Sequence, residues 1–66
     1  MQVLLNGKKK EIPNNTQLKE IIEQFCRNTK RVIAEVNGDI VKRHLWEECL
    51  IHPGDTIELV NLVGGG

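Results

Sequence analysis

The sequence predicts an α+β fold in which one amphipathic helix packs on one face of a mixed sheet of four to five strands. Two Asn-Gly pairs, Asn6-Gly7 and Asn37-Gly38, each lie between short strand-like runs and predict two β-hairpins. Between them, a segment repeats apolar residues with helical spacing. One helix and one sheet, each with an apolar face, bury both faces with the fewest elements when they form two layers.

The first hairpin joins Val3-Leu4-Leu5 to residues 8–12 through Asn6-Gly7. Asn-Gly readily takes the two positive φ values of a type I′ turn, so the two runs are expected to pair antiparallel. The second run contains Lys8-Lys9-Lys10, which could mark a site for anions or nucleic acid. A strand with charged outward positions gives the same pattern and discourages pairing at a sheet edge, and we favour that interpretation.

The helix follows Pro13-Asn14-Asn15, a stretch that breaks the strand pattern. Its apolar face is predicted at i, i+3, i+4 and i+7, which are Leu18, Ile21, Ile22 and Phe25. Thr16 is the expected N-cap by residue type, although Lys19 stands where a capping box would have Glu or Gln.

The second half of the chain predicts three more elements. Residues 31–36 alternate, with one face formed by Val32, Ala34 and Val36 and the other by Ile33 and Glu35. Asn37-Gly38 then leads into a short strand at Ile40-Val41. Residues 42–48 are mostly polar and suit a short helical turn or an irregular crossover. His52-Pro53-Gly54-Asp55 is a turn by composition, and residues 56–62 form a final strand with Ile57 and Leu59 inward.

This order of elements is that of the β-grasp, or ubiquitin-like, fold. In that fold the first and last strands lie side by side, so the chain leaves from a central, well-anchored strand. We expect residues 1–62 to form the β-grasp domain and residues 63–66 to form a flexible C-terminal tail.

The composition restricts the possible functions. A chain of 66 residues forms one domain, buries only about 60% of the surface that its unfolded form exposes, and has no interior to spare for a cofactor. Nine basic and nine acidic residues give a net charge of zero, which removes the general electrostatic case for nucleic acid or acidic membranes. We expect neither nucleic acid nor a membrane as a partner.

The cellular compartment is also predicted from the sequence. The first apolar run has three residues, where a signal peptide would need 7 to 15, and no run approaches the 18 residues of a membrane span. Two cysteines are too few to suggest a disulfide scaffold. We therefore expect a cytoplasmic protein with reduced thiols.

Soft metal ligands are few and badly spaced. Cys26, Cys49, His44 and His52 match no zinc pattern, and Cys49 with His52 gives at most half a site. We predict no metal site and no thiol chemistry, with Cys26 and Cys49 as small core or near-surface residues.

The sequence closes on Gly64-Gly65-Gly66, directly after an apolar run. Glycine has no Cβ, so such an end can pass through a channel too narrow for other residues. From Val63 to Gly66 an extended chain reaches roughly 13 Å, enough to enter another protein's active site. The alternative is a frayed end or a leftover linker.

A family resemblance rests on Val36-Asn37-Gly38-Asp39-Ile40-Val41, on Arg43 and Trp46, on Gly54-Asp55, and on Val63-Gly64-Gly65-Gly66. Over nearly the whole chain these residues resemble the bacterial sulfur carrier proteins of thiamine biosynthesis. The fold and the Gly-Gly end are shared with the small subunit of molybdopterin synthase and with ubiquitin-related modifiers. The short length and the Asn-Gly, Arg and Trp spacing favour the thiamine carriers. Lys42 departs from the proline often found there, and three glycines stand where two suffice.

The resemblance implies a carrier cycle. An adenylyltransferase similar to the ubiquitin E1 would adenylate the Gly66 carboxylate with ATP. A persulfide, from a cysteine desulfurase or another donor, would then displace AMP and leave a thiocarboxylate. Thiazole synthase would take the sulfur from that group. The chain would be a co-substrate rather than an enzyme, a monomer when free, with no bound cofactor and with Gly64 and Gly65 threading the partner's active site.

Several residues are candidate contacts for such partners. Val60, Leu62 and Val63 lie just before the glycines and are predicted to dock on partner enzymes. Arg43 and Trp46 could contact a partner, but packing over one end of a small core is the favoured role of Trp46. The alternatives are a sulfur carrier for molybdopterin synthesis, a ubiquitin-like protein modifier, and a noncovalent β-grasp binding module.

Overall fold

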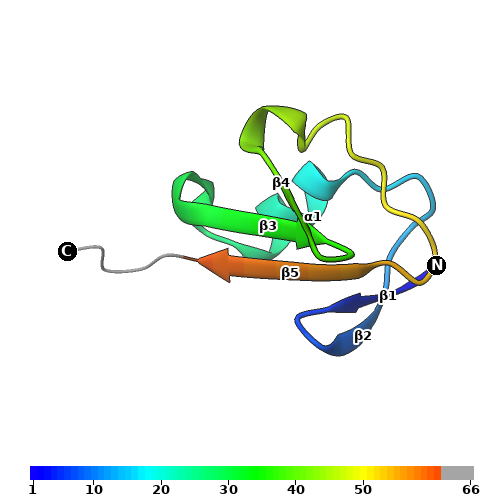
Figure 1. Cartoon of the computed structure of the whole chain (residues 1–66). Coiled ribbons are helices and arrows are strands. Elements are labelled where there is room, and N and C mark those ends of the chain that lie inside the picture. Colours follow the sequence, from blue (N-terminus) through cyan, green and yellow to red (C-terminus); the bar gives the residue numbers. More distant parts are fainter. Residues whose placement is uncertain (62–66) are drawn as a thin grey trace.

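The computed structural model describes residues 1–61 and contains a five-stranded mixed sheet with one α-helix across one of its faces (Figure 1). The strands are β1 (Gln2–Leu5), β2 (Lys8–Glu11), β3 (Val32–Val36), β4 (Asp39–Val41) and β5 (Thr56–Asn61), and the helix is α1 (Leu18–Phe25). Two short 3-10 turns, Thr29–Arg31 and Arg43–Leu45, lie in the connections. The predicted α+β fold class is confirmed. The predicted boundary between residues 62 and 63 lies outside the described residues.

The strand order β2-β1-β5-β3-β4 places the last strand in the middle of the sheet. β1 and β5 run parallel, with Leu4 opposite Thr56 and Leu5 opposite Ile57, and the other three neighbouring pairs are antiparallel. The prediction that the first and last strands are neighbours is therefore confirmed. Within the described residues, β5 has a strand on each side.

Both predicted hairpins form at their Asn-Gly pairs. Asn6 and Gly7 have φ values of 51° and 81°, and Asn37 and Gly38 have 53° and 88°. A type I′ turn requires positive φ at both central residues, and asparagine and glycine adopt it at low cost. These turns set the antiparallel registers of β1 with β2 and of β3 with β4.

The predicted N-cap is wrong by one residue. The N-cap of α1 is Gln17, whose backbone N–H donates to the Glu20 carboxylate at 2.7 Å, as the acidic residue of a capping box does. Thr16 instead donates its hydroxyl to the Pro13 carbonyl at 2.6 Å. The hydroxyl thus closes the turn before the helix, a local bond that competes with capping.

Phe25 is also placed differently from the prediction. Leu18, Ile21 and Ile22 are buried as expected, whereas Phe25, the last residue of α1, is 44% exposed. The strand on that side, β2, is charged and fully exposed, so it offers no apolar cover. Its Lys10 places Nζ 5.5 Å from the Phe25 ring centroid. All three lysines of β2 are exposed, in keeping with a solvated edge strand.

The core lies between α1 and the inward face of the sheet. The inward residues of β5, Ile57 and Leu59, are buried and half-buried, as predicted. The loop before β5 closes the core with Ile51, which donates its N–H to the Thr16 carbonyl at 2.9 Å. The buried apolar residues are Val3, Leu5, Leu18, Ile21, Ile22, Val32, Ala34, Trp46, Ile51 and Ile57. Neither the helix nor the 3-10 turns in residues 1–61 provide an apolar span of membrane-crossing length.

Candidate functional site

The end of β5 is where the described structure meets the predicted reactive residues. Val60, one of the predicted docking residues, is 48% exposed on the face of the sheet opposite α1. Leu62, Val63, Gly64, Gly65 and Gly66 lie outside the described residues. The described geometry is therefore that of β5, the strand that leads to them.

The side chains of two turn asparagines, Asn6 and Asn37, form hydrogen bonds with the backbone of β5. The Oδ1 atom of Asn6 accepts from the Leu59 backbone N–H at 2.8 Å, beyond the point where β1 stops pairing with β5. The Oδ1 atom of Asn37 accepts from the Thr56 N–H at 2.9 Å, and its Nδ2 donates to Asp55 at 3.0 Å. Both asparagines thus shape a turn with their backbone and hold β5 with their side chain. The strand is fixed at its start and near its end.

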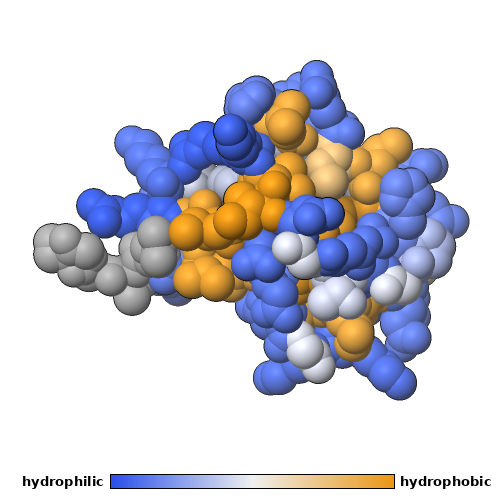
Figure 2. All heavy atoms as spheres, viewed as in Figure 1, coloured by the Kyte–Doolittle hydropathy of each residue, from blue (hydrophilic) through white to orange (hydrophobic). Residues whose placement is uncertain are grey.

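The sheet face that α1 leaves open carries an apolar surface beside Val60. Ile33 of β3 lies directly opposite Val60 in the register, and Ile40 of β4 lies next to Glu35 of β3. Ile33 is 38% exposed and Ile40 is 66% exposed. Figure 2 shows apolar side chains gathered over β3 and β5, next to the end of β5. We call Ile33, Ile40 and Val60 the open-face apolar surface.

Of these three residues, only Val60 is predicted from the sequence as a docking residue. The alternation of β3 already placed Ile33 on the face opposite Val32 and Ala34. Its pairing with Val60 depends on the β3–β5 register between segments far apart in the sequence. Ile40 was assigned only to a short strand, and no pattern in the sequence marks it as exposed.

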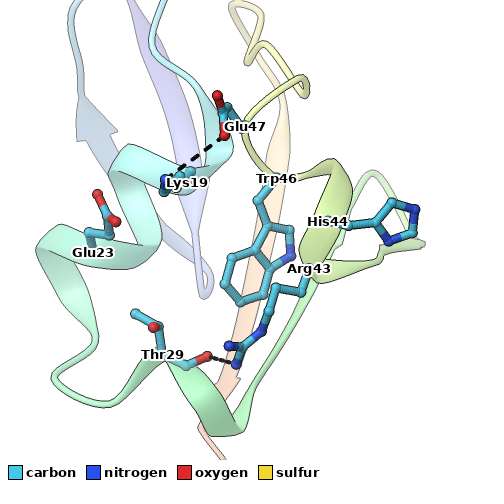
Figure 3. Close-up of a pocket in the computed structure, with 7 residues that line it drawn as sticks. All are labelled: Lys19, Glu23, Thr29, Arg43, His44, Trp46 and Glu47. Atoms are coloured by element: carbon cyan, nitrogen blue, oxygen red, sulfur yellow. Dashed lines mark hydrogen bonds and ion pairs between the residues drawn. The ribbon is translucent and has the colours of Figure 1, made fainter.

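Arg43 and Trp46 lie on the other side of the molecule, over the end of the core. Trp46 is 5% exposed and its indole Nε1 donates to the Val41 carbonyl at 2.9 Å. The Arg43 guanidinium lies 5.4 Å from the indole ring centroid and donates to the Thr29 carbonyl (Figure 3). Arg43 thereby joins the two 3-10 turns and covers the indole. Both side chains are engaged within their own chain.

A shallow cavity of about 260 Å³ lies beside this pair. Its lining includes both cations and anions, and Lys19 and Glu47 approach each other to 4.0 Å across it (Figure 3). Because the two signs of charge are mixed, the lining presents no uniform field for an anion or a cation. The arrangement supports a structural role for this region.

The thiols of Cys26 and Cys49 are the other reactive groups considered from the sequence. Cys26 and Cys49 are both free and half-buried. Burial, with the negative charge of Asp55 as the smaller cause, raises the pKa of the Cys49 thiol. A raised pKa keeps the sulfur protonated and weakly nucleophilic at neutral pH. Within residues 1–61, no three His, Cys, Asp or Glu side chains gather as a metal site would require.

Comparison with known proteins decides the family. Residues 3–66 match the model of the ThiS family. The chain belongs to the ThiS family. The resemblance found in the sequence is thereby confirmed, and the family match extends through the closing glycines, outside the described residues.

Members and relatives of the ThiS family are similar over nearly the whole chain. The sulfur carrier protein ThiS of Escherichia coli is 27% identical over 66 residues, which is the full length of both chains. An uncharacterized protein, ycf40, of Trieres chinensis is 32% identical over 62 residues, covering 94% of this chain and 85% of its own. A thiazole synthase of Paramagnetospirillum magneticum is 23% identical over 66 residues, which make up 20% of that longer protein.

A solved ThiS structure has the same fold. The crystal structure of the thiamine biosynthesis protein ThiS from Geobacter metallireducens matches with a TM-score of 0.86 at 23% identity, covering all of both chains. This agreement confirms the β-grasp assignment.

Proposed function

We propose that this chain is a sulfur carrier of thiamine biosynthesis whose Gly66 carboxylate is converted into a thiocarboxylate. The observation that carries the proposal is the ThiS family match over residues 3–66, which includes the closing glycines. The full-length relative in Escherichia coli is named a sulfur carrier protein, which supports the assignment. The position of β5 supports it too, because a reactive end needs a rigid root.

The proposed chemistry uses the last carboxylate and enzymes that act on it. A Gly66 carboxylate oxygen attacks the α-phosphorus of ATP on an E1-like adenylyltransferase, and pyrophosphate leaves. A persulfide sulfur, from a cysteine desulfurase or another donor, attacks the acyl carbon and AMP leaves. A thiol then cleaves the S–S bond, which releases the thiocarboxylate and leaves a disulfide on the donor side. Glycine at positions 65 and 66 places no side chain beside the reacting carbonyl, and positioning is a large part of such catalysis.

Thiazole synthase is the proposed acceptor of the sulfur. The thiazole synthase of Paramagnetospirillum magneticum contains a segment similar to all 66 residues of this chain. Joining a carrier to its acceptor raises their effective concentration, which supports a functional pairing. We propose that the chain is a co-substrate rather than an enzyme, holds no cofactor, and works in the cytoplasm, where ATP and thiols are available.

The test is the intact mass of the protein. Incubation with ATP, the adenylyltransferase of the same organism and a persulfide donor is expected to give the mass gain of one oxygen-to-sulfur exchange. A chain without Gly65 and Gly66 is the control and should show no gain. An unchanged mass, with the same adenylyltransferase shown to be active on another carrier, would contradict the proposal. Lysine-linked conjugates that resist thiol and hydroxylamine would indicate a protein modifier instead.

A further inference from the structure

Two glutamates face each other in the middle of the open sheet face. Glu35 of β3 lies directly opposite Glu58 of β5 in the antiparallel register. Side chains in such positions have Cβ atoms about 4.5–5.5 Å apart, and like charges there oppose folding. Glu58 is exposed and Glu35 is half-buried. A like-charged pair facing across β3 and β5 is therefore a local cost that the fold itself does not explain.

Within the described residues, no ion pair neutralises these two glutamates. The ion pairs within residues 1–61 join Met1 to Glu11, Lys19 to Glu47 and His52 to Asp55, and none includes either of these glutamates. The chain has nine basic residues, so cations are not scarce. The three lysines of β2 lie at the far edge of the sheet, with β1 between them and β5. The open face thus presents two uncompensated carboxylates.

Apolar side chains border the two carboxylates on two sides. Across the sheet, Ile40, Glu35 and Glu58 follow one another on β4, β3 and β5, and the facing residues Ile33 and Val60 form the next row. When a partner covers the apolar residues it removes water, and charge-assisted hydrogen bonds to the carboxylates become stronger. A guanidinium or ammonium group flanked by apolar side chains is the matching surface on a partner.

We propose that the Glu35–Glu58 pair binds a cationic side chain of thiazole synthase and that the open-face apolar surface packs around it. This inference rests on the proposed function and names how the carrier recognises its acceptor. The synthase is the chosen partner because a thiazole synthase contains a segment similar to this whole chain. Glu58 and Val60 of this face also belong to β5, the strand that precedes the proposed sulfur-bearing residue in the chain.

The test compares two double variants that carry the same change in charge. Glu35→Gln with Glu58→Gln removes the pair, whereas Glu23→Gln with Glu48→Gln removes two exposed carboxylates outside the sheet, one on α1 and one after the 3-10 turn Arg43–Leu45. Binding to purified thiazole synthase of the same organism is measured by calorimetry at low and high salt. The first variant is expected to bind at least about tenfold more weakly and to lose most of the salt dependence. The second should bind like the unmodified chain.

Measurements of folding stability, adenylation and thiocarboxylate formation distinguish this inference from its alternatives. Removing the like charges should leave the urea midpoint of unfolding unchanged or raise it, so a clear fall would contradict the inference. Binding of the first variant equal to that of the unmodified chain would overturn it. So would weakened adenylation combined with normal binding to the synthase, because the pair would then serve the adenylyltransferase. Failure of the unmodified chain to form a thiocarboxylate would overturn the proposed function, a separate result.

Discussion

Trp46 shows how one residue closes a small core. It is buried beside the 3-10 turn Arg43–Leu45, and its indole N–H satisfies the Val41 carbonyl at the end of β4. The Arg43 guanidinium lies over the ring and joins the turn to Thr29. The Arg and Trp spacing that carried the family resemblance is thus explained by packing in this structure.

This packing predicts the effect of Trp46→Phe. Phenylalanine keeps an aromatic ring but leaves the Val41 carbonyl without its partner, so the free energy of unfolding should fall by about 1–3 kcal/mol. Urea unfolding followed by circular dichroism measures it, because the variant lacks the only tryptophan. Arg43→Lys keeps a cation near the ring and should cost less. Equal stability of Trp46→Phe and the unmodified chain would show that the buried hydrogen bond contributes nothing.

Cys49 predicts a pH dependence at the residue scale. Burial first, and Asp55 second, raise the pKa of its thiol, so folding favours the protonated form. At pH 8 the Cys49 thiolate is scarcer than in an ordinary cysteine, and alkylation by iodoacetamide should be slower than in the urea-unfolded chain. The stabilisation from this shift is present below the ordinary thiol pKa and is lost as the pH rises through the raised value. Cys26→Ser isolates the Cys49 signal, and equal rates in the folded and unfolded chains would refute the shift.

At the scale of elements, β5 is held by side chains where strand pairing ends. β1 pairs with it only as far as Ile57, and the Asn6 side chain then takes the place of a strand by accepting from Leu59. Because β5 leads to the proposed reactive end, this bond fixes the direction in which the strand leaves the body. Asn6 has a positive φ, which glycine also adopts readily. Substitution of Asn6 with glycine therefore keeps the turn conformation of the backbone and removes only the side-chain hydrogen bond.

We predict that Asn6→Gly lowers the free energy of unfolding by about 0.5–1.5 kcal/mol, because it keeps the turn but removes the bond to Leu59. The Leu59 amide should also exchange its hydrogen faster. Asn15→Gly is the matched control: Asn15 has a similar φ of 64°, and its side chain makes no hydrogen bond within residues 1–61. Equal loss of stability in both variants would assign the effect to backbone entropy rather than to the bond.

The elements also show what the sequence could and could not predict. The hairpins and the central position of β5 followed from Asn-Gly chemistry and from fold topology. The predicted N-cap was wrong because residue-type preference favours Thr16, whereas the hydrogen bond to the Glu20 carboxylate makes Gln17 the N-cap. Phe25 matches the helical spacing of the apolar face, but it is exposed because the neighbouring strand β2 is charged and offers no apolar residues to cover it. The facing pairs of the open sheet face depend on a register between segments about 25 residues apart, which local patterns do not encode.

At the scale of the whole molecule, folding and the proposed chemistry use different residues. The buried core ends at Ile57, and the apolar residues beyond it in the described part are half-buried or exposed. Family membership, in contrast, extends through residue 66. Substitutions among the closing glycines should therefore change sulfur loading without changing the stability of the body.

We predict that Gly66→Ala and Gly65→Ala each reduce the rate of thiocarboxylate formation by about a hundredfold, because a methyl group beside the reacting carbonyl misplaces it by roughly an ångström. Gly64→Ala, farther from the carboxylate, should reduce that rate much less. The rate is measured by intact mass after mixing with ATP, the adenylyltransferase and a persulfide donor. The urea midpoint of all three variants should equal that of the unmodified chain, because the buried core of the described residues ends at Ile57. If Gly64→Ala were as slow as Gly66→Ala, the narrow part of the partner's channel would extend over all three glycines. If all three were as fast as the unmodified chain, the absence of side chains could not be the reason that the sequence closes on glycine.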